Sequence, residues 1–562
     1  MLVQPYLIRF AVGTAALAAM ALLVGFDPAI AGDKKPDAKQ KTAKAVPAVP
    51  AKVQQSKEKV AVVKPSTEGK QLGYLELANL IDKAIDTRLQ AEKVIPSERA
   101  DDSEFLRRVY LDIVGHIPTA EQAAAFIDNK DANKRAKLVE ELLASPDYGR
   151  HMADMWKSLL LPRNSDNRAL QTDPMTKWLE EGFNSDKPWN KIVHEVLTAT
   201  GEQDKDGAVT YYVANATVDK ITDNVTKVFL GVQLQCAQCH NHPFTDWKQT
   251  EYWGMAAFFM KVQSTPPQMA ARNGSSPEVK ETNQPRRGRN GLPDSAKQVP
   301  PKFLGGDEPK VKASDPLRPV VADWITSAKN PYFAKAMVNR IWAQFMGRGL
   351  VNPVDDMQDG NPPSHPELLA DLAEQFANGN NFDVKYVIKA ICNSQAYQRS
   401  SKPNSQNADA AGELYARMAI KVLTPEQFFD SLRVAVSNGK APLDPPTVTG
   451  PRGLKFSPRT QFVQFFEAED GSDPTDYQNG IPQALRLMNS PQLNNGQAAQ
   501  VMIRGKSKEQ AVEQLFLTAV SRRPKVKELE MVDKLMKKED APKVYADLLW
   551  ALLNSSEFTL NH

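Results

Sequence analysis

The sequence predicts a mainly α fold, with two helical domains joined by a Pro-rich flexible spacer. Apolar residues recur at helical spacing through most of the chain, capping patterns precede several of these stretches, and alternating strand patterns are few. A chain of 562 residues with 41% hydrophobic residues is long enough for two domains, each with a core of its own. We therefore expect a first domain over 71–263, the spacer over 264–312 and a second domain over 313–562.

The first 70 residues precede the predicted folded part. Arg9 is followed by an apolar run over 10–26 and by Ala29-Ile30-Ala31, which together predict a signal peptide over 1–31 that is cleaved on export. An uncleaved anchor is the alternative, because 17 apolar residues lie at the lower limit for crossing a bilayer. Residues 32–70 hold ten Lys against four acidic residues and no aromatic residue, which predicts a disordered linker.

Charge and cysteine content exclude some classes of protein. The formal charge of +3 comes from the linker, so residues 71–562 carry about −3, and the chain does not have the clustered cations of a nucleic-acid binder. With only Cys236, Cys239 and Cys392, no disulfide framework is available. We expect an exported protein, periplasmic, secreted or on the cell surface, with no membrane span after signal cleavage.

Helical patterns define the first domain. Asp101 with Glu104, and Thr119 with Gln122, form capping patterns. The first of them precedes residues that share one helix face, namely Phe105, Leu106, Val109, Tyr110 and Ile113. Further helices are predicted over 132–143 and 152–161. The spacer that follows, 264–312, contains eight Pro and nine cations against five acidic residues.

The second domain is predicted to be helical as well. Asn330-Pro331 is expected to cap a helix with Pro at its first position, and Gly347 to end it. Ser364 and Glu367 suggest a capping box around His365-Pro366, with His365 as a helix-start residue. The last helices are expected over 511–520 and 544–553.

The motif Cys236-Ala237-Gln238-Cys239-His240 carries the most chemical information. In c-type haem proteins the two thiols of C-x-x-C-H form thioethers with the haem, and the histidine is the proximal iron ligand. One turn presents all three groups to one haem edge. The sequence therefore predicts haem c bound by Cys236, Cys239 and His240.

Two alternatives stay open for this motif. Cys236, Cys239, His240 and His242 are all plausible zinc ligands, and His151 or His194 could complete such a set. A local disulfide between Cys236 and Cys239 is the other alternative in an oxidising compartment. A thioredoxin-type role is excluded, because the surrounding sequence is helical.

The sixth iron ligand is unknown, and the nearest thioether candidates are Met255, Met260 and Met269. Met255 and Met260 also belong to a helix face that predicts core packing. Two acidic groups are interpreted as turns or caps, because their spacing matches no calcium loop. These are Asp355-Asp356 and the acidic loop with Glu467, Glu469, Asp470, Asp473 and Asp476.

Two long segments carry a family resemblance. VFLGVQLQCAQCHNHPFTDWKQTEYWGMAAFF from Val228, with FLRRVYLDIVGHIPT from Phe105, resembles the planctomycete cytochrome-type domain of unknown function. NPYFAKAMVNRIWAQFMGRGLV from Asn330, NPPSHPELL from Asn361, QALRLMNSP from Gln483 and LLWALLNSSEF from Leu548 resemble the planctomycete-specific domain that follows it. The resemblance implies an exported two-domain protein and supports Cys236, Cys239 and His240 as the haem-type motif, with His242 and Pro243 in the same signature.

We therefore expect an exported protein with one covalent haem c that serves electron transfer or redox support, with a periplasmic redox partner. The alternative is a non-redox binding or assembly protein with a cell-surface partner, in which Cys236, Cys239, His240 and His242 form a structural disulfide or a zinc site. A polysaccharide hydrolase is a third hypothesis, and it would need a pair of carboxylates in a cleft.

Overall fold

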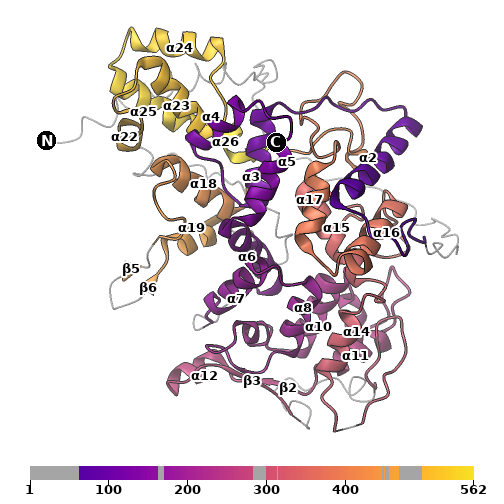
Figure 1. Ribbon diagram of the computed structural model, residues 1–562. Coiled ribbons are helices and arrows are strands. Elements are labelled where there is room, and N and C mark those ends of the chain that lie inside the picture. The colour runs from indigo at the N-terminus through magenta and orange to yellow at the C-terminus, as the bar shows by residue number, and fades with distance from the viewer. Residues whose placement is uncertain are drawn as a thin grey trace, which may run out of the picture.

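The computed structural model describes residues 63–162, 170–282, 299–312, 314–445, 448–449, 455–466 and 496–562. Within these ranges the fold is mainly α, as predicted (Figure 1). None of the helices in these ranges has both the length and the apolar character that a membrane crossing requires. The predicted signal peptide, the linker up to residue 62, the acidic loop from Glu467 and the segment from Gln483 to Pro491 lie outside the described residues.

The first region is built from ten helices in the part of the chain that the structure describes. Asp101 accepts a hydrogen bond from the Glu104 amide, and Thr119 and Gln122 form a complete capping box, so both predicted caps are confirmed. The helices are α2 Tyr74–Ala91, α3 Asp102–Ile113, α4 Ala120–Asp128, α5 Lys134–Ala144, α6 Pro146–Leu160, α7 Asp173–Asn184, α8 Trp189–Thr198, α9 Thr210–Ala214, α10 Val218–Asn224 and α11 Gln249–Ala257. Three short turns lie among them: η1 Gly207–Val209, η2 Val225–Phe229 and η3 Gln235–Gln238.

The predicted disordered linker is shorter than expected at its C-terminal end. Residues 63–70 are placed, and the carboxylate of Asp371 accepts hydrogen bonds from Ser66 and Thr67 at 2.8–3.1 Å. Composition predicted disorder because this stretch has too few apolar residues to form a core of its own. The Asp371 carboxylate of the second region instead holds Ser66 and Thr67 by hydrogen bonds.

The structure does not establish a flexible spacer over 264–312, because described residues of this segment form regular elements. The strands β1 Gly201–Glu202, β2 Val262–Ser264 and β3 Glu278–Glu281 form an antiparallel sheet in the order β1-β3-β2, and α12 Pro267–Arg272 lies between β2 and β3. Further on, the ring of Phe303 stacks on Phe258 and Trp324, with centroids 5.5 and 5.0 Å apart. A few apolar side chains therefore bind this Pro-rich segment to the core.

The second region contains the remaining elements of the described chain. Its helices and helical turns are α14 Arg318–Ile325, α15 Phe333–Met346, α16 Pro366–Glu374, η4 Gln375–Gly379, α17 Val384–Asn393, η5 Gly412–Leu414, α18 Pro425–Ser437, α19 Pro458–Phe466, α22 Gln497–Ile503, α23 Lys508–Val520, α24 Val526–Met536, α25 Ala541–Leu553 and α26 Ser556–Thr559. Strand β4 Lys421–Val422 pairs with β7 Leu560–Asn561, and β5 Val448–Thr449 pairs with β6 Lys455–Phe456.

The predicted helix ends of this region are partly confirmed. Gly347 ends α15 with a φ of 79°, and the side-chain oxygen Oδ1 of Asn330 accepts from the backbone amides of Tyr332 and Phe333 at the start of the helix. Pro331, however, lies before the first helical residue instead of occupying it. The capping box at Ser364 is also wrong, because the Ser364 hydroxyl pairs with Nδ1 of His365, the residue that precedes α16.

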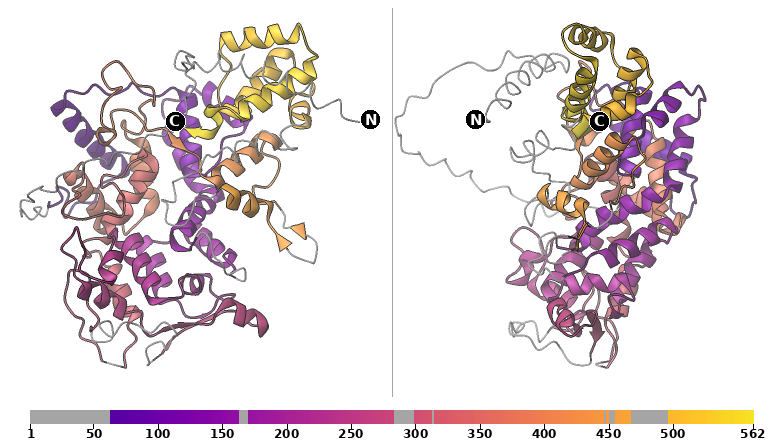
Figure 2. Two further views of the ribbon diagram at one scale, coloured as in Figure 1. Left: turned by 180° about the vertical axis from the view of Figure 1, so that it is seen from behind. Right: turned by 90° about the vertical axis from the view of Figure 1, so that its left-hand side faces the viewer.

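Two hydrophobic cores cross the predicted domain boundary. The first combines residues of α2 to α11 with residues of α14 to α17, whereas the second combines α18, α19 and α22 to α26 with Leu111 and Ile117 of the first region. Helix α3 contacts both cores. Its buried Arg107 donates to the carbonyls of Ala519 and Phe558 beside the second core. Its buried Arg108 donates to the carbonyls of Tyr397 and Arg399 beside the first core. Figures 1 and 2 show α22 to α25 at one end of the molecule and α12, β2 and β3 at the other.

Candidate functional site

The C-x-x-C-H motif occupies a short exposed turn. The chain leaves η2 at Gly231, whose φ of 68° suits glycine, and enters the 3₁₀ helix η3. Ala237 is fully buried, whereas Cys236 and Cys239 are exposed free thiols. In a 3₁₀ helix side chains three residues apart eclipse one another. Cys236 and Cys239 therefore lie on one side of the turn, facing solvent.

Helix α11 holds this turn in place. The side-chain amide of Gln249 donates to the carbonyls of Gln238 and Cys239, at 3.0 and 2.9 Å, and the Trp253 indole donates to Gln238 at 3.2 Å. The backbone amide of Gln249 donates to the side chain of Asn241 at 3.0 Å. Carbonyls at the end of a helical turn have no partner within it. The side chains of α11 supply these partners and fix the backbone that carries the thiols.

His240 is arranged to offer a free ring nitrogen. Its Nδ1 lies 2.7 Å from the backbone carbonyl of Asn241, and a carbonyl only accepts, so Nδ1 must carry the proton. In the neutral ring the lone pair then lies on Nε2. Because the residue is exposed, this nitrogen is available to a metal.

His242 has the opposite arrangement. Its Nδ1 accepts from the amides of Phe244 and Thr245 at 3.2 and 3.1 Å, so the proton of the neutral ring lies on Nε2. Its own backbone amide donates to Trp247 at 2.8 Å. Binding a metal through Nε2 would require the other tautomer and would cost both hydrogen bonds to Nδ1. The geometry thus assigns His242 to the folding of the loop over 242–247.

The alternative zinc set is not assembled here. In the described ranges no three residues among His, Cys, Asp and Glu are grouped so as to hold a metal ion. His151 is buried on α6, and His194 on α8 pairs with Asp323 at 3.0 Å. The alternative disulfide is not formed either, since both thiols are free.

The candidate sixth ligands lie in different surroundings. Met255 and Met260 are 0% and 9% exposed and belong to the first core, which confirms their predicted packing role. Met269 lies on α12 and is 56% exposed. Among the described residues, no hydrogen bond joins any of these three methionines to the exposed His240.

The donor set itself fits covalent haem. Two accessible thiols lie on one side of a rigid turn, and the next residue is a histidine with a free Nε2, which is the ligand chemistry that haem c requires. An apolar surface is also close in the chain, because the Phe244 ring is 79% exposed beside His242.

The two acidic residues after Pro353 support the structure around the motif. Asp355 is buried and accepts from Gln233 at 2.9 Å and from Lys227 at 3.2 Å, while the amide of Met357 donates to the Gly231 carbonyl at 2.9 Å. The second region therefore fixes the segment that leads into Cys236. Asp356 accepts from Gln358 and Asn361, as expected for a turn.

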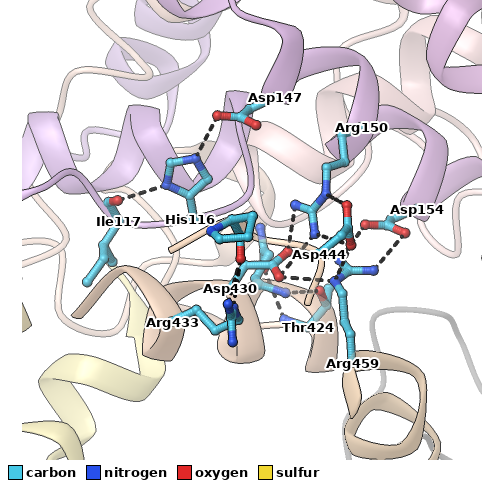
Figure 3. A network of polar contacts seen from close by, with 12 residues as sticks. His116, Ile117, Asp147, Arg150, Asp154, Thr424, Asp430, Arg433, Asp444 and Arg459 are labelled. Carbon is cyan, nitrogen blue, oxygen red and sulfur yellow. Dashed lines mark hydrogen bonds and ion pairs between the residues drawn. The ribbon is translucent and has the colours of Figure 1, made fainter. Parts of the chain in front are cut away.

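Sequence reasoning missed a buried ionic network that joins α6 to α18 and α19. In Figure 3 the carboxylates of Asp154, Asp430 and Asp444 surround the guanidinium groups of Arg150 and Arg459. Burial alone would raise the pKa of Asp154, but Arg459 and Lys157 outweigh it and hold that pKa well below its usual range. The sequence did contain a signal for this network, namely a charged residue at the spacing of a buried helix face. Asp430 lies at helical spacing from Gln427 and Val434, which are buried on the same face of α18.

Comparison with known families agrees with the two-part organisation. Residues 80–264 match the family PSCyt2, described as a protein of unknown function (DUF1549), and residues 317–536 match PSD1, described as a protein of unknown function (DUF1553). No curated protein and no solved structure shows significant similarity to the chain. The chain therefore contains two domains in this order, one matched by the planctomycete cytochrome-like model PSCyt2 and one matched by PSD1, both of unknown function.

Proposed function

We propose that this protein binds one haem c covalently and serves electron transfer or redox support outside the cytoplasm. Cys236 and Cys239 would form the two thioethers, and His240 would be the proximal ligand. The observation that carries the proposal is the pairing of two exposed thiols on one side of η3 with a histidine whose Nε2 is free.

The chain's own residues prepare this site. The Asn241 carbonyl accepts a hydrogen bond from Nδ1–H of His240 and so orients the ring, which leaves Nε2 free. Gln249 and Trp253 keep the thiol-bearing backbone in one conformation, so little ordering is needed on attachment. When bound, haem supplies a reversible one-electron change at its iron.

Location and partner form part of the same proposal. A cleavable signal over 1–31 would deliver the chain to the compartment in which haem c is attached, and a periplasmic or surface redox partner would exchange the electron. The exposed Phe244 ring gives this partner an apolar contact close to the motif.

The test is to express the full chain with its signal alongside a haem c maturation system, then record a pyridine haemochrome spectrum and a metal assay. We expect one haem per chain that survives denaturation, and loss of covalent haem in Cys236→Ala/Cys239→Ala. Cys392→Ala is the matched control, because it removes the buried third thiol. Absence of covalent haem, with or without stoichiometric zinc, would replace this proposal by the non-redox binding or assembly function.

A second pair of variants separates the two histidines. His240→Ala should change the spectrum of the iron, whereas His242→Ala should leave the iron ligation unchanged, since His242 uses its Nδ1 to order the loop. Equal spectral changes in both variants would contradict the assignment of His240 as the proximal ligand.

A further inference from the structure

A cavity of about 530 Å³ lies in the second region, away from the C-x-x-C-H motif in sequence. It is formed by the end of α15, the loop that follows this helix, and residues around 401–403 and 410–420. Its size falls within the roughly 300–1,000 Å³ of pockets for small molecules. Small residues keep the space open, among them Ala410, Ala411, Gly412 and Ala416.

Two arginines line this cavity, and their charge is poorly compensated. Arg417 is half-buried and has no hydrogen-bond or ion-pair partner in the described part of the chain. Nε of Arg348 is buried without a partner, and its Nη2 reaches Glu413 only at 3.6 Å. Glu413 is also 3.4 Å from Arg88. Arg88 and Arg348 thus share the Glu413 carboxylate, and Arg417 has no paired carboxylate among the described residues.

The remaining lining is suited to an apolar group. Met346, Met418 and Ile420 contribute to the walls, and Ile420 is 59% exposed. The polar residues Asn352 and Ser401 also line the cavity. Ligand pockets characteristically combine such apolar walls with a few polar groups that orient the ligand.

An uncompensated guanidinium at a partly dehydrated cavity calls for an anion. Its planar donors match the two oxygens of a carboxylate, sulfate or phosphate group, and such charge-assisted bonds are stronger than neutral ones. We propose that this cavity binds a small organic oxyanion, with the charged group on Arg417 and Arg348 and an apolar body against the methionine and alanine side chains. This site does not depend on haem.

The test uses calorimetric titration of the purified full chain with three probes: 2-naphthoate, 2-naphthalenesulfonate and 2-naphthyl phosphate. These probes share an apolar body and differ in the oxyanion. Their order of affinity therefore shows whether the cavity prefers a carboxylate, a sulfonate or a phosphate group. We expect saturable binding of at least one of them and much weaker binding of neutral 2-naphthamide. Inorganic phosphate alone should bind more weakly than 2-naphthyl phosphate, since it lacks the apolar body.

Variants assign the binding to this cavity. Arg417→Gln should weaken the affinity of the anionic probe about 10- to 100-fold, as expected for a lost charge-assisted hydrogen bond. Ala411→Phe should reduce binding by filling space without changing charge, and Arg504→Gln, which removes an exposed arginine elsewhere, should have no effect.

The proposal is overturned if no probe binds, if 2-naphthamide binds as tightly as 2-naphthoate, or if Arg417→Gln and Arg504→Gln behave alike. Melting temperatures of the variants establish that each is folded, and Ala411→Phe keeps the test decisive should Arg417→Gln fail to fold.

Discussion

Replacing Asp430 by Asn should strongly destabilise the protein, because this carboxylate is buried between two guanidinium groups (Figure 3). Asp430 is 2% exposed and accepts from Arg150 at 2.9 and 3.1 Å and from Arg459 at 3.0 and 2.8 Å. The substitution keeps the volume of the side chain but removes its charge. The two guanidinium groups would then have only Asp154 and Asp444 as paired carboxylates among the described residues.

The expected loss follows from burial. Removing one partner from a buried ion pair costs about 3–5 kcal/mol. Because Arg150 keeps Asp444 and Arg459 keeps Asp154, we expect a loss of about 3 kcal/mol, at the lower end of this range. Asp444 gives a matched control: it also pairs with Arg150 at 2.9 Å, but its side chain is 66% exposed. Asp444→Asn should therefore cost no more than about 1 kcal/mol.

Urea denaturation followed by far-ultraviolet circular dichroism measures both variants. Since the network joins α6 of the first core to α18 and α19 of the second, amide exchange in Asp430→Asn should increase first in α18, α19 and α23. Equal losses of unfolding free energy in Asp430→Asn and Asp444→Asn would refute the reasoning. The burial of the carboxylate would then not determine how much stability is lost when its charge is removed.

Three further predictions concern the first region. Gly115→Ala should destabilise the fold by about 1–3 kcal/mol in the same denaturation assay, since φ is 76° and the added Cβ would lie 2.5 Å from Nδ1 of His151; a neutral effect would contradict this. Burial lowers the pKa of His151 from 6.5 to about 4, so the unfolded chain binds the proton first as the pH falls. The contribution of neutral His151 to the free energy of unfolding is complete above pH 6.5. It is lost as the pH falls from 6.5 to 4, by on the order of 3 kcal/mol. His151→Gln should therefore flatten the measured pH dependence of the unfolding free energy in this window. Gln249→Ala should raise hydrogen exchange over 235–241 while costing only about 1 kcal/mol per lost bond, and unchanged exchange there would show that α11 does not hold the turn.

Local signals in the sequence predicted the elements whose determinants are themselves local. The caps at Asp101 and Thr119 and the stop at Gly347 depend on hydrogen bonds or dihedral angles within a few residues, so they could be inferred from spacing. The box at Ser364 failed for an equally local reason, because the neighbouring His365 competes for the Ser364 hydroxyl.

Long-range contacts explain what the sequence did not reveal. The Pro-rich stretch after residue 264 has no helical period, yet Val279 and Leu304 are buried and Phe303 stacks between two rings from distant segments. The sequence predicted His240 as the haem ligand and left the role of His242 open, since the spacing makes both plausible metal ligands. Only the hydrogen bonds to Nδ1 separate them, one with a carbonyl and the other with two amides.

The first core gives a physical reason for the two matched regions to occur together in this chain. Helices α14 to α17 of the second region complete a core begun by the first, and Asp355 and Met357 hold the segment that leads into Cys236. Without the second region, the Gly231 carbonyl would lose the hydrogen bond from the Met357 amide, and the buried faces of the first region would be exposed to solvent. The rigidity of the C-x-x-C-H turn thus depends on residues more than a hundred positions away, so the site belongs to both regions although its reactive groups lie in one.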